Sequence, residues 1–351
     1  MIEHLRPNVR AMSGYVPGEQ PRDGVFVKLN TNENPYPPSP RVFEALRDAL
    51  TGDRLRRYPD PTGVQFRQTA GRVLGVDPDG VLIGNGSDDI LTIVTRAFVP
   101  EGGLIVSPTP SYLLYRTLAD LQGARFQTVP FTKDWNLPEP WPVAHAHLTF
   151  VANPNSPSGT TVGLERLQRL AGELKGPLVV DEAYADFADD NAMSLTKPNG
   201  RSPGVIVSRT FSKYYSLAGA RFGFAVADPA IVRELLKVKD SYNCDVLSLT
   251  AATAALEDQD YYRSLRARIL ATRGRLTEAL GRLGFVIPPS QANFVWCRRD
   301  DQPVKPLYEE LKNRHILVRY MNYEGSGDGL RITVGTDAEV DRLIEELTGL
   351  V

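Results

Sequence analysis

The stretch VIVSRTFSKYYSLAGARFGFAVAD (residues 205–228) contains two apolar runs separated by a polar loop. The runs at 205–212 and 222–228 are typical of strands, and the loop carries hydroxyls, a lysine and an arginine. Lys213 is one of only nine lysines in the chain and lies directly after the first strand. A lone lysine is more often a solvated surface residue. Near hydroxyl side chains and Arg221, however, its amine would be partly desolvated and its pKa depressed, as a Schiff base requires.

Strand and helix patterns alternate on the amino-terminal side of this stretch. Apolar runs predict strands at 81–86, 103–108, 124–130, 147–154 and 178–184. Helical spacing of apolar residues separates them, at 41–50, 64–74, 90–98, 112–121 and 164–174. Several of the strands are apolar on both faces, which favours an α/β fold with a mostly parallel sheet and helices on both sides.

The last hundred residues show a different order of elements. A long helical region at 258–283 precedes strand patterns at 285–289, 293–298, 316–320 and 330–335, a helix at 306–314 and a final amphipathic helix from Asp337. This order predicts a small α+β domain. Because 351 residues exceed what one core usually organises, we expect an arm at 1–30 that packs with the small domain, a large domain at 31–250 and the small domain at 251–351.

Composition excludes several classes of protein. The formal net charge of −2 predicts neither a nucleic-acid nor an acidic-membrane partner. Only Cys244 and Cys297 are present, which excludes a disulfide framework and favours a reducing compartment. The absence of a signal peptide and of an apolar run of about 20 residues predicts a soluble cytoplasmic protein. The four histidines (His4, His145, His147 and His315) show no grouping that predicts a metal site.

Polar residues follow several of the predicted strands, where a parallel sheet places its ligands. GNGSDD (84–89) offers backbone N–H groups and a helix N-terminus, which could hold a phosphate together with Ser212 and Arg221. A plain tight turn into a helix explains this motif equally well. It lacks the third glycine of the dinucleotide fingerprint and has no Walker lysine, which disfavours nucleotide binding.

Asp181 is more informative, because it ends the apolar run LVVD and is costly to bury without a cation. It would either pair with an arginine or cap a loop in a purely structural role, or face a protonated pyridine nitrogen and make that ring an electron sink. In the second case Tyr184 and Asn153 could reach the phenolic oxygen of the same ring.

Three motifs in this order resemble the fold-type I aminotransferases that depend on pyridoxal 5'-phosphate (PLP). They are NPNSPSG (153–159), DEAYADF (181–187) and SRTFSKYYSLAGARFGF (208–224). LNTNENPYPPSP (29–40), RYPDPTG (57–63) and GNGSDD narrow the resemblance to the histidinol-phosphate aminotransferases. It covers essentially the whole chain.

The resemblance implies a role for each matching residue. Lys213 would hold PLP covalently and act as the catalytic base, Asp181 would pair with the ring nitrogen, and Asn153 and Tyr184 would bind the ring hydroxyl. The cofactor phosphate would be held by the backbone of Ser87 and Asp88 and by the side chains of Thr210, Ser212 and Arg221. Tyr112 would stack on the ring, where it could otherwise be a core aromatic.

The resemblance also implies a homodimer and a substrate site. Tyr58 would reach the cofactor phosphate of the neighbouring subunit. Arg331 would bind the acidic end of the substrate, a phosphate in this family, with Tyr15, Arg319 and Asn153 as helpers. An arginine in an edge strand could otherwise be a surface residue.

The expected reaction is a ping-pong transamination in histidine biosynthesis, in which histidinol phosphate and 2-oxoglutarate give imidazole-acetol phosphate and glutamate. An aromatic amino-acid aminotransferase and a lyase resembling threonine-phosphate decarboxylase would share every cofactor residue. A PLP-binding regulator is disfavoured, because no basic DNA-binding module is attached. The chain departs from the family at 155–159 (Asn-Ser-Pro-Ser-Gly for Asn-Asn-Pro-Thr-Gly) and at 214–219, where Tyr214 and Ser216 could alter substrate preference.

Overall fold

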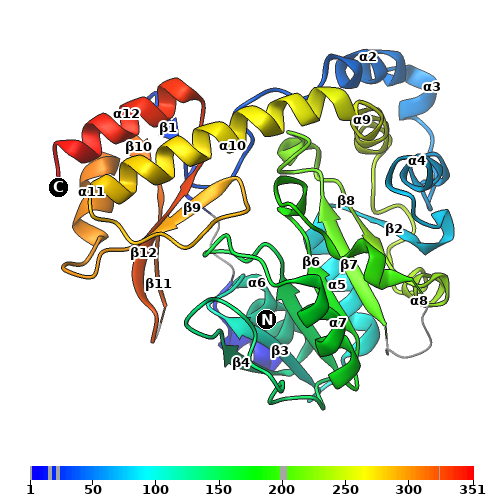
Figure 1. Cartoon of the computed structure of the whole chain (residues 1–351). Coiled ribbons are helices and arrows are strands. Elements are labelled where there is room, and N and C mark those ends of the chain that lie inside the picture. Colours follow the sequence, from blue (N-terminus) through cyan, green and yellow to red (C-terminus); the bar gives the residue numbers. More distant parts are fainter. Residues whose placement is uncertain (1, 15–17, 21–23, 198–203, 324) are drawn as a thin grey trace.

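The computed structural model describes residues 2–14, 18–20, 24–197, 204–323 and 325–351. The long helix α10 (Gln259–Arg282) runs from a larger part, built around one sheet, to a smaller part that contains the carboxyl end of the chain (Figure 1). Within the described residues, no helix combines the length and the apolar character needed to cross a bilayer.

The larger part is built on a seven-stranded sheet. In spatial order its strands are β2 (Val81–Gly84), β8 (Gly223–Val226), β7 (Val205–Thr210), β6 (Leu178–Asp181), β5 (Leu148–Ala152), β3 (Leu104–Thr109) and β4 (Arg125–Pro130). Only β8 is antiparallel to its neighbours, β2 and β7. The predicted mostly parallel sheet is therefore confirmed.

Helices cover both faces of this sheet, because its strands carry apolar side chains on both faces. Leu82 and Val179 face one layer of helices, whereas Val81 and Val180, each one residue away, face the other. The first layer comprises α5 (Ser87–Phe98), α6 (Leu114–Gln122) and α8 (Pro229–Leu235). The second comprises α4 (Val64–Leu74), α7 (Leu164–Glu173) and α9 (Val246–Glu257), with α2 (Pro40–Ala49) and α3 (Gly52–Leu55) beyond them.

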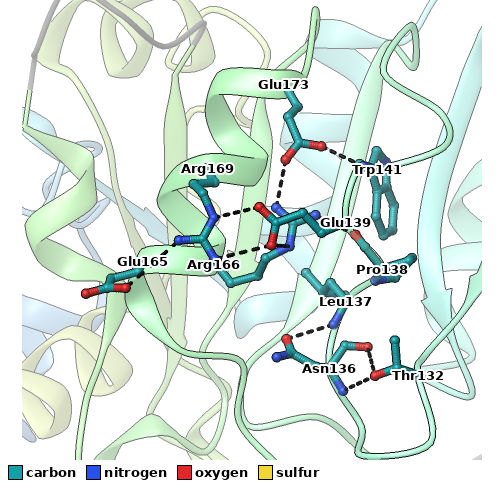
Figure 2. A network of polar contacts seen from close by, with 10 residues as sticks. All are labelled: Thr132, Asn136, Leu137, Pro138, Glu139, Trp141, Glu165, Arg166, Arg169 and Glu173. Atoms are coloured by element: carbon teal, nitrogen blue, oxygen red, sulfur yellow. Dashed lines mark hydrogen bonds and ion pairs between the residues drawn. The ribbon is translucent and has the colours of Figure 1, made fainter.

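Two arginines of α7 fasten the connection between β4 and β5 to that helix (Figure 2). The buried Arg166 donates from Nη1 to Glu173 Oε1 (2.9 Å) and from Nη2 to the Pro138 carbonyl (2.6 Å). Glu173 in turn accepts from the Trp141 backbone N–H at 2.6 Å. Arg169 pairs with Glu139 at 2.8 Å. This network replaces regular secondary structure in holding a long loop against α7.

The smaller part combines a three-stranded antiparallel sheet with helices. The sheet has the order β11 (Arg319–Tyr323), β12 (Gly327–Thr333) and β9 (Phe294–Cys297). Helices α11 (Lys305–Asn313) and α12 (Asp337–Thr348) pack with it and with the last turns of α10. A capping box between Thr336 and Glu339 starts α12, since each side chain accepts the backbone N–H of the other residue.

The amino-terminal arm touches both parts. Helix α1 (Pro7–Ala11) lies on the larger part, where Asn8 donates to the Asp120 carbonyl of α6 at 2.6 Å. Strand β1 (Val27–Lys28) pairs in parallel with β10 (Ile316–Leu317) of the smaller part. The arm was expected to pack with the small domain. Strand β1 does pack with it, whereas the first helix lies on the larger part.

Two expectations about secondary structure need correction. Residues 285–289 form only an isolated bridge, Val286 to Arg298, because Pro288 and Pro289 have no N–H to donate to a ladder. The sequence analysis also missed α9, whose apolar residues surround the helix and give no amphipathic pattern. The expected domain boundary at 250 falls inside α9, which packs on α2 and α4. We propose the junction of α9 and α10 as the boundary instead.

Candidate active site

A cavity of about 260 Å3 lies where strands β2, β3, β5, β6 and β7 end. Its wall is completed by β11, β12 and the arm, so it lies between the two parts of the molecule. Most of the residues predicted from the sequence line it together: Ser87, Asp88, Tyr112, Asp181, Tyr184, Thr210, Ser212, Lys213, Arg221, Arg319 and Arg331. The carboxyl ends of parallel strands meet at one edge of a sheet, which explains why segments so distant in sequence converge here.

The amine of Lys213 lies at the centre of this group. Its Nζ donates to the Thr31 carbonyl at 2.9 Å and lies 5.9 Å from the centroid of the Tyr184 ring. Burial, followed by the positive charge of Arg331, lowers the pKa of Lys213 to about 8, against the opposing pull of Glu33 and Asp88. Roughly a tenth of the amine is therefore uncharged at pH 7, enough for a nucleophile or a base.

One end of the cavity is built for an anion. Helix α5 begins after Gly86, and among the described residues no side chain caps its first turn, so its N–H groups are open to a ligand. Arg221 reaches the same place, where its Nη1 donates to Ser212 Oγ at 3.0 Å and its Nη2 lies 3.6 Å from Asp88 Oδ2. Arg221 has a left-handed backbone (φ +51°), an uncommon conformation that the surrounding loop imposes.

Asp181 forms the acidic wall of the cavity and is 4% exposed. Its Oδ2 accepts from the Tyr115 hydroxyl at 2.9 Å, and its Oδ1 accepts from the Ala183 N–H at 3.3 Å. Burial raises the pKa of Asp181 to about 6, and the hydrogen bond from Tyr115 is the strongest influence against that rise. A buried carboxylate without a cation is energetically costly. A positively charged ring nitrogen would supply the missing cation.

Two tyrosines flank Asp181. The Tyr112 hydroxyl donates to Asp88 Oδ1 at 3.3 Å, and its ring meets Tyr115 edge to face at 5.6 Å. Tyr184 is held by Asn32, whose Nδ2 donates to the phenolic oxygen at 2.9 Å. Both rings are therefore fixed at the cavity wall by groups from other elements.

Two arginines of the smaller part, Arg319 and Arg331, line the cavity. Arg331 on β12 lies directly across the ladder from Arg319 on β11. Arg331 donates from Nη1 to Ser156 Oγ (3.0 Å) and from Nη2 to the Asn30 carbonyl (3.1 Å), while its buried Nε has no hydrogen-bond partner among the described residues. Like charges on directly opposed positions repel, so this pair favours a bound anion.

Asn153 does not join the cavity, although the sequence analysis gave it a place beside the ring hydroxyl. Its Oδ1 accepts from the Val162 N–H at 2.7 Å and its Nδ2 donates to the Val162 carbonyl at 3.2 Å. These two bonds close the turn that follows β5. The side chain of this segment that lines the cavity with a polar group is Ser156.

Two further predicted residues lie elsewhere. Tyr58 is 80% exposed and stacks on Tyr242, with ring centroids 4.3 Å apart. It borders a second hollow, lined by α3, α4 and α9, and not the cavity beside Lys213. Tyr15, the other suggested helper of Arg331, lies outside the described residues.

Several residues that form the cavity or contact Asp181 were not predicted from the sequence. Asn30 and Thr31 stand in LNTNENPYPPSP, a motif that was noted without a role for its individual residues. Ser156 was treated as a departure from the family pattern without a contact. Tyr115 follows Tyr112 by three residues, one helical turn, yet no local pattern predicts its bond to Asp181.

The arrangement combines an anion cradle, a buried acid and a weakly basic amine. Within about 260 Å3 it offers covalent capture by Lys213, a partner for a ring cation at Asp181 and a second anion site at Arg331. Such a site suits a phosphorylated, electron-withdrawing ring together with a substrate that carries its own negative group.

Comparison with known proteins agrees with this geometry. Residues 25–347 match the family described as aminotransferase class I and II. The chain is 50% identical to histidinol-phosphate aminotransferase of Rhodopirellula baltica, over 96% of this chain and 92% of that protein. It is 46% identical to histidinol-phosphate aminotransferase 1 of Nostoc sp., over 100% and 99% of the two chains.

A solved structure is similar over the same length. The crystal structure of histidinol-phosphate aminotransferase from Sinorhizobium meliloti, in complex with pyridoxal-5'-phosphate, superimposes with a TM-score of 0.87 at 27% identity, covering 99% of this chain and 98% of that one. The family match spans nearly all of the chain and includes every element that lines the cavity. This chain therefore belongs to the class I and II aminotransferases.

Proposed function

We propose that the chain is a PLP-dependent aminotransferase that exchanges histidinol phosphate and 2-oxoglutarate for imidazole-acetol phosphate and glutamate. The observation that carries the proposal is the pairing of Arg319 and Arg331 across β11 and β12, facing the cavity that contains Lys213. The names of the relatives at 46–50% identity point to the same substrate.

The residues present fit the cofactor. The first turn of α5, Ser212 and Arg221 would hold its phosphate, with Gly86 leaving room, since a Cβ there would lie 2.7 Å from Arg221 Nη2. Asp181 would face the ring nitrogen and Tyr112 would stack on the ring. When bound, PLP withdraws electrons from the substrate carbon that bears the amine.

The chain itself supplies the proton transfers. Lys213 Nζ, with its lowered pKa, would take a proton from the substrate carbon that bears the amine and would then deliver it to the reacting carbon of bound PLP. Asp181 would keep the ring nitrogen of bound PLP protonated in its buried setting. The Tyr184 hydroxyl, oriented by Asn32, would donate a hydrogen bond to the ring hydroxyl of bound PLP and so lower the proton affinity of the Lys213 nitrogen that is linked to it.

A phosphate suits the arginine end better than a lone carboxylate. Arg331 lines the cavity while bonded to Ser156 and Asn30, and Arg319 adds a second guanidinium from the paired position on β11. A phosphate has three oxygens and close to two negative charges with which to accept from both groups. Histidinol phosphate presents such a group at the far end from its amine.

The test is a half-reaction with the PLP-loaded chain, following the absorbance of the bound cofactor. Histidinol phosphate should bleach it rapidly, whereas histidinol, phenylalanine and threonine phosphate should act at least tenfold more slowly. Replacing Arg319→Gln should raise the KM for histidinol phosphate about 10- to 100-fold, because a charge-assisted hydrogen bond is lost. The matched control is Arg298→Gln, an arginine of the same domain that does not line the cavity.

Other outcomes of this test reject the substrate assignment. Fast bleaching by phenylalanine alone indicates an aromatic aminotransferase. Release of carbon dioxide from threonine phosphate indicates the lyase. Equal rates with histidinol and histidinol phosphate would show that Arg319 and Arg331 do not select a substrate phosphate.

A homodimer and a cytoplasmic location complete the proposal. Exposed apolar side chains gather on α2, α3 and the segment around Tyr58: Phe43, Leu50, Leu55, Tyr58 and Val64. Such a group of side chains is typical of a surface that is covered in an assembly. A reducing compartment suits Cys244 and Cys297, which are both buried and unpaired.

A further inference from the structure

Tyr115 lies directly beneath the cavity without lining it. The side chain is fully buried on α6 and stacks on Phe150 of β5, with ring centroids 4.6 Å apart and planes 8° apart. Its hydroxyl donates to Asp181 Oδ2 at 2.9 Å, and its ring meets Tyr112 edge to face. One residue thus contacts both the acid and the aromatic ring of the site.

We propose that Tyr115 is a positioning residue that keeps Asp181 ionised and fixes the direction of its carboxylate. This inference rests on the proposed function for its purpose, because an ionised Asp181 matters only if it faces a positively charged ring nitrogen. The hydrogen bond itself is a property of the chain alone and can be tested without the cofactor.

The surroundings of Asp181 explain why it needs this donor. Among the described residues Asp181 forms no ion pair, and the two charges that act on it most strongly, Asp88 of α5 and Glu182, the next residue along the chain, are both negative. Glu182 is already paired with Arg209 at 2.8 Å. Within the part of the chain that the structure describes, the Tyr115 hydroxyl and the Ala183 N–H are the donors to the carboxylate.

Tyr115 is a dependable donor. Burial, followed by the charge of Asp181, raises the pKa of Tyr115 well above its usual value, so the hydroxyl stays protonated at every working pH. Stacking on Phe150 fixes the plane of the Tyr115 ring. The Tyr115 hydroxyl therefore donates to Asp181 Oδ2 from a fixed position.

Removing this hydroxyl has a predictable sign. Burial raises the pKa of Asp181 from its ordinary value of 3.8 to about 6 in the folded chain, so the folded state binds the proton more tightly and stability falls as pH rises between these two values. Tyr115→Phe should raise the folded pKa further, by about one to two pH units. Its stability deficit relative to the native chain should therefore be constant below about pH 6 and grow above it, up to about pH 8.

The experiment measures urea unfolding of the cofactor-free full chain from pH 5 to pH 8. Tyr262→Phe is the matched control, because Tyr262 is equally buried and its hydroxyl accepts from the Ser39 N–H, away from any acid of the cavity. The deficit of Y115F should grow with pH, whereas that of Y262F should not. In a D181N background the pH dependence of Y115F should vanish.

A second readout uses the cofactor. Y115F should weaken PLP binding about tenfold or more, with Y262F unchanged, since a protonated Asp181 no longer attracts a ring cation. A Y115F deficit that is flat with pH would overturn the inference. If the pH effect is present but even the native chain fails to bind PLP, the positioning role stands and the proposed function fails.

Discussion

At the scale of single residues, the turn after β5 separates two roles that the sequence alone merged. Asn153 uses both ends of its amide on the backbone of Val162, whereas Ser156 accepts from Arg331 at the cavity wall. Asn153 therefore maintains the shape of the loop, and Ser156 orients the guanidinium that would receive the substrate. The Ser156 hydroxyl is the group that accepts from Arg331, so removing it should disturb the orientation of the Arg331 guanidinium before it disturbs the fold.

Two alanine variants should separate these roles. Ser156→Ala should raise the KM for the amino donor about 5- to 10-fold with little change in stability, because one hydrogen bond to Arg331 is lost. Asn153→Ala should cost about 1–3 kcal/mol of unfolding free energy, since it leaves buried backbone groups of Val162 without partners. Steady-state kinetics and urea unfolding measure the two effects. A normal stability together with a raised KM in N153A would reassign that residue to the binding site.

At the scale of elements, the start of α5 depends on a glycine. Gly86 has φ +81°, and a Cβ on it would lie 2.7 Å from Arg221 Nη2 and 3.2 Å from its Cζ. The tip of a long side chain yields more readily than backbone, so a larger residue at 86 would displace Arg221 from Ser212 and leave the fold in place. The glycine thus keeps the anion cradle open.

Gly86→Ala should therefore weaken PLP binding about tenfold or more, because it disturbs one charge-assisted donor. Gly102→Ala is the control, since Gly102 also has positive φ (+71°) but nothing within 4 Å of its would-be Cβ. G102A should lose about 1 kcal/mol of stability from its positive φ, and G86A about 1–3 kcal/mol, because φ +81° with ψ 168° is adopted almost exclusively by glycine. Titration of the cofactor-free chains with PLP measures the difference. Equal affinities for G86A and G102A would show that Arg221 is not needed there.

At the scale of the whole molecule, the cavity and Tyr58 are on different surfaces of one chain. Tyr58 is exposed beside Tyr242 and the second hollow, and exposed apolar side chains also occur on α2 and α3. A two-fold assembly would place Tyr58 of one subunit at the cavity of the other, twice, by symmetry. The proposed dimer therefore predicts that each active site needs two chains.

Mixing two impaired variants tests whether each active site needs residues from two chains. Lys213→Ala removes the amine, and Tyr58→Phe removes the cross-subunit hydroxyl. Each variant alone should be impaired, but a hybrid of the two carries one site with both native groups. An equal mixture, refolded together, should reach about a quarter of native activity, because half the dimers are hybrids with one intact site of two. A monomer on size-exclusion chromatography, or no gain on mixing, would reject the shared site.

Much of the fold followed from local patterns. The strands after residue 80 and the helices between them were predicted because the spacing of apolar residues differs between a strand and a helix. The exceptions have physical causes. Helix α9 is apolar all round because other helices enclose it, and the prolines after Val286 prevent a strand that its apolar residues suggested.

By itself, the sequence determined which chemical groups lie at the ends of the strands. Lys213, Asp181, Tyr184 and Ser212 follow apolar runs that parallel strands bring to one edge, and Arg221 precedes the next apolar run. Only the tertiary structure decided the partners of those groups. Asn153 turned to Val162, Arg319 came to lie opposite Arg331, and Tyr115 came to lie beneath Asp181. Side-chain direction and cross-strand register depend on packing between segments far apart in the chain, and no local spacing encodes them.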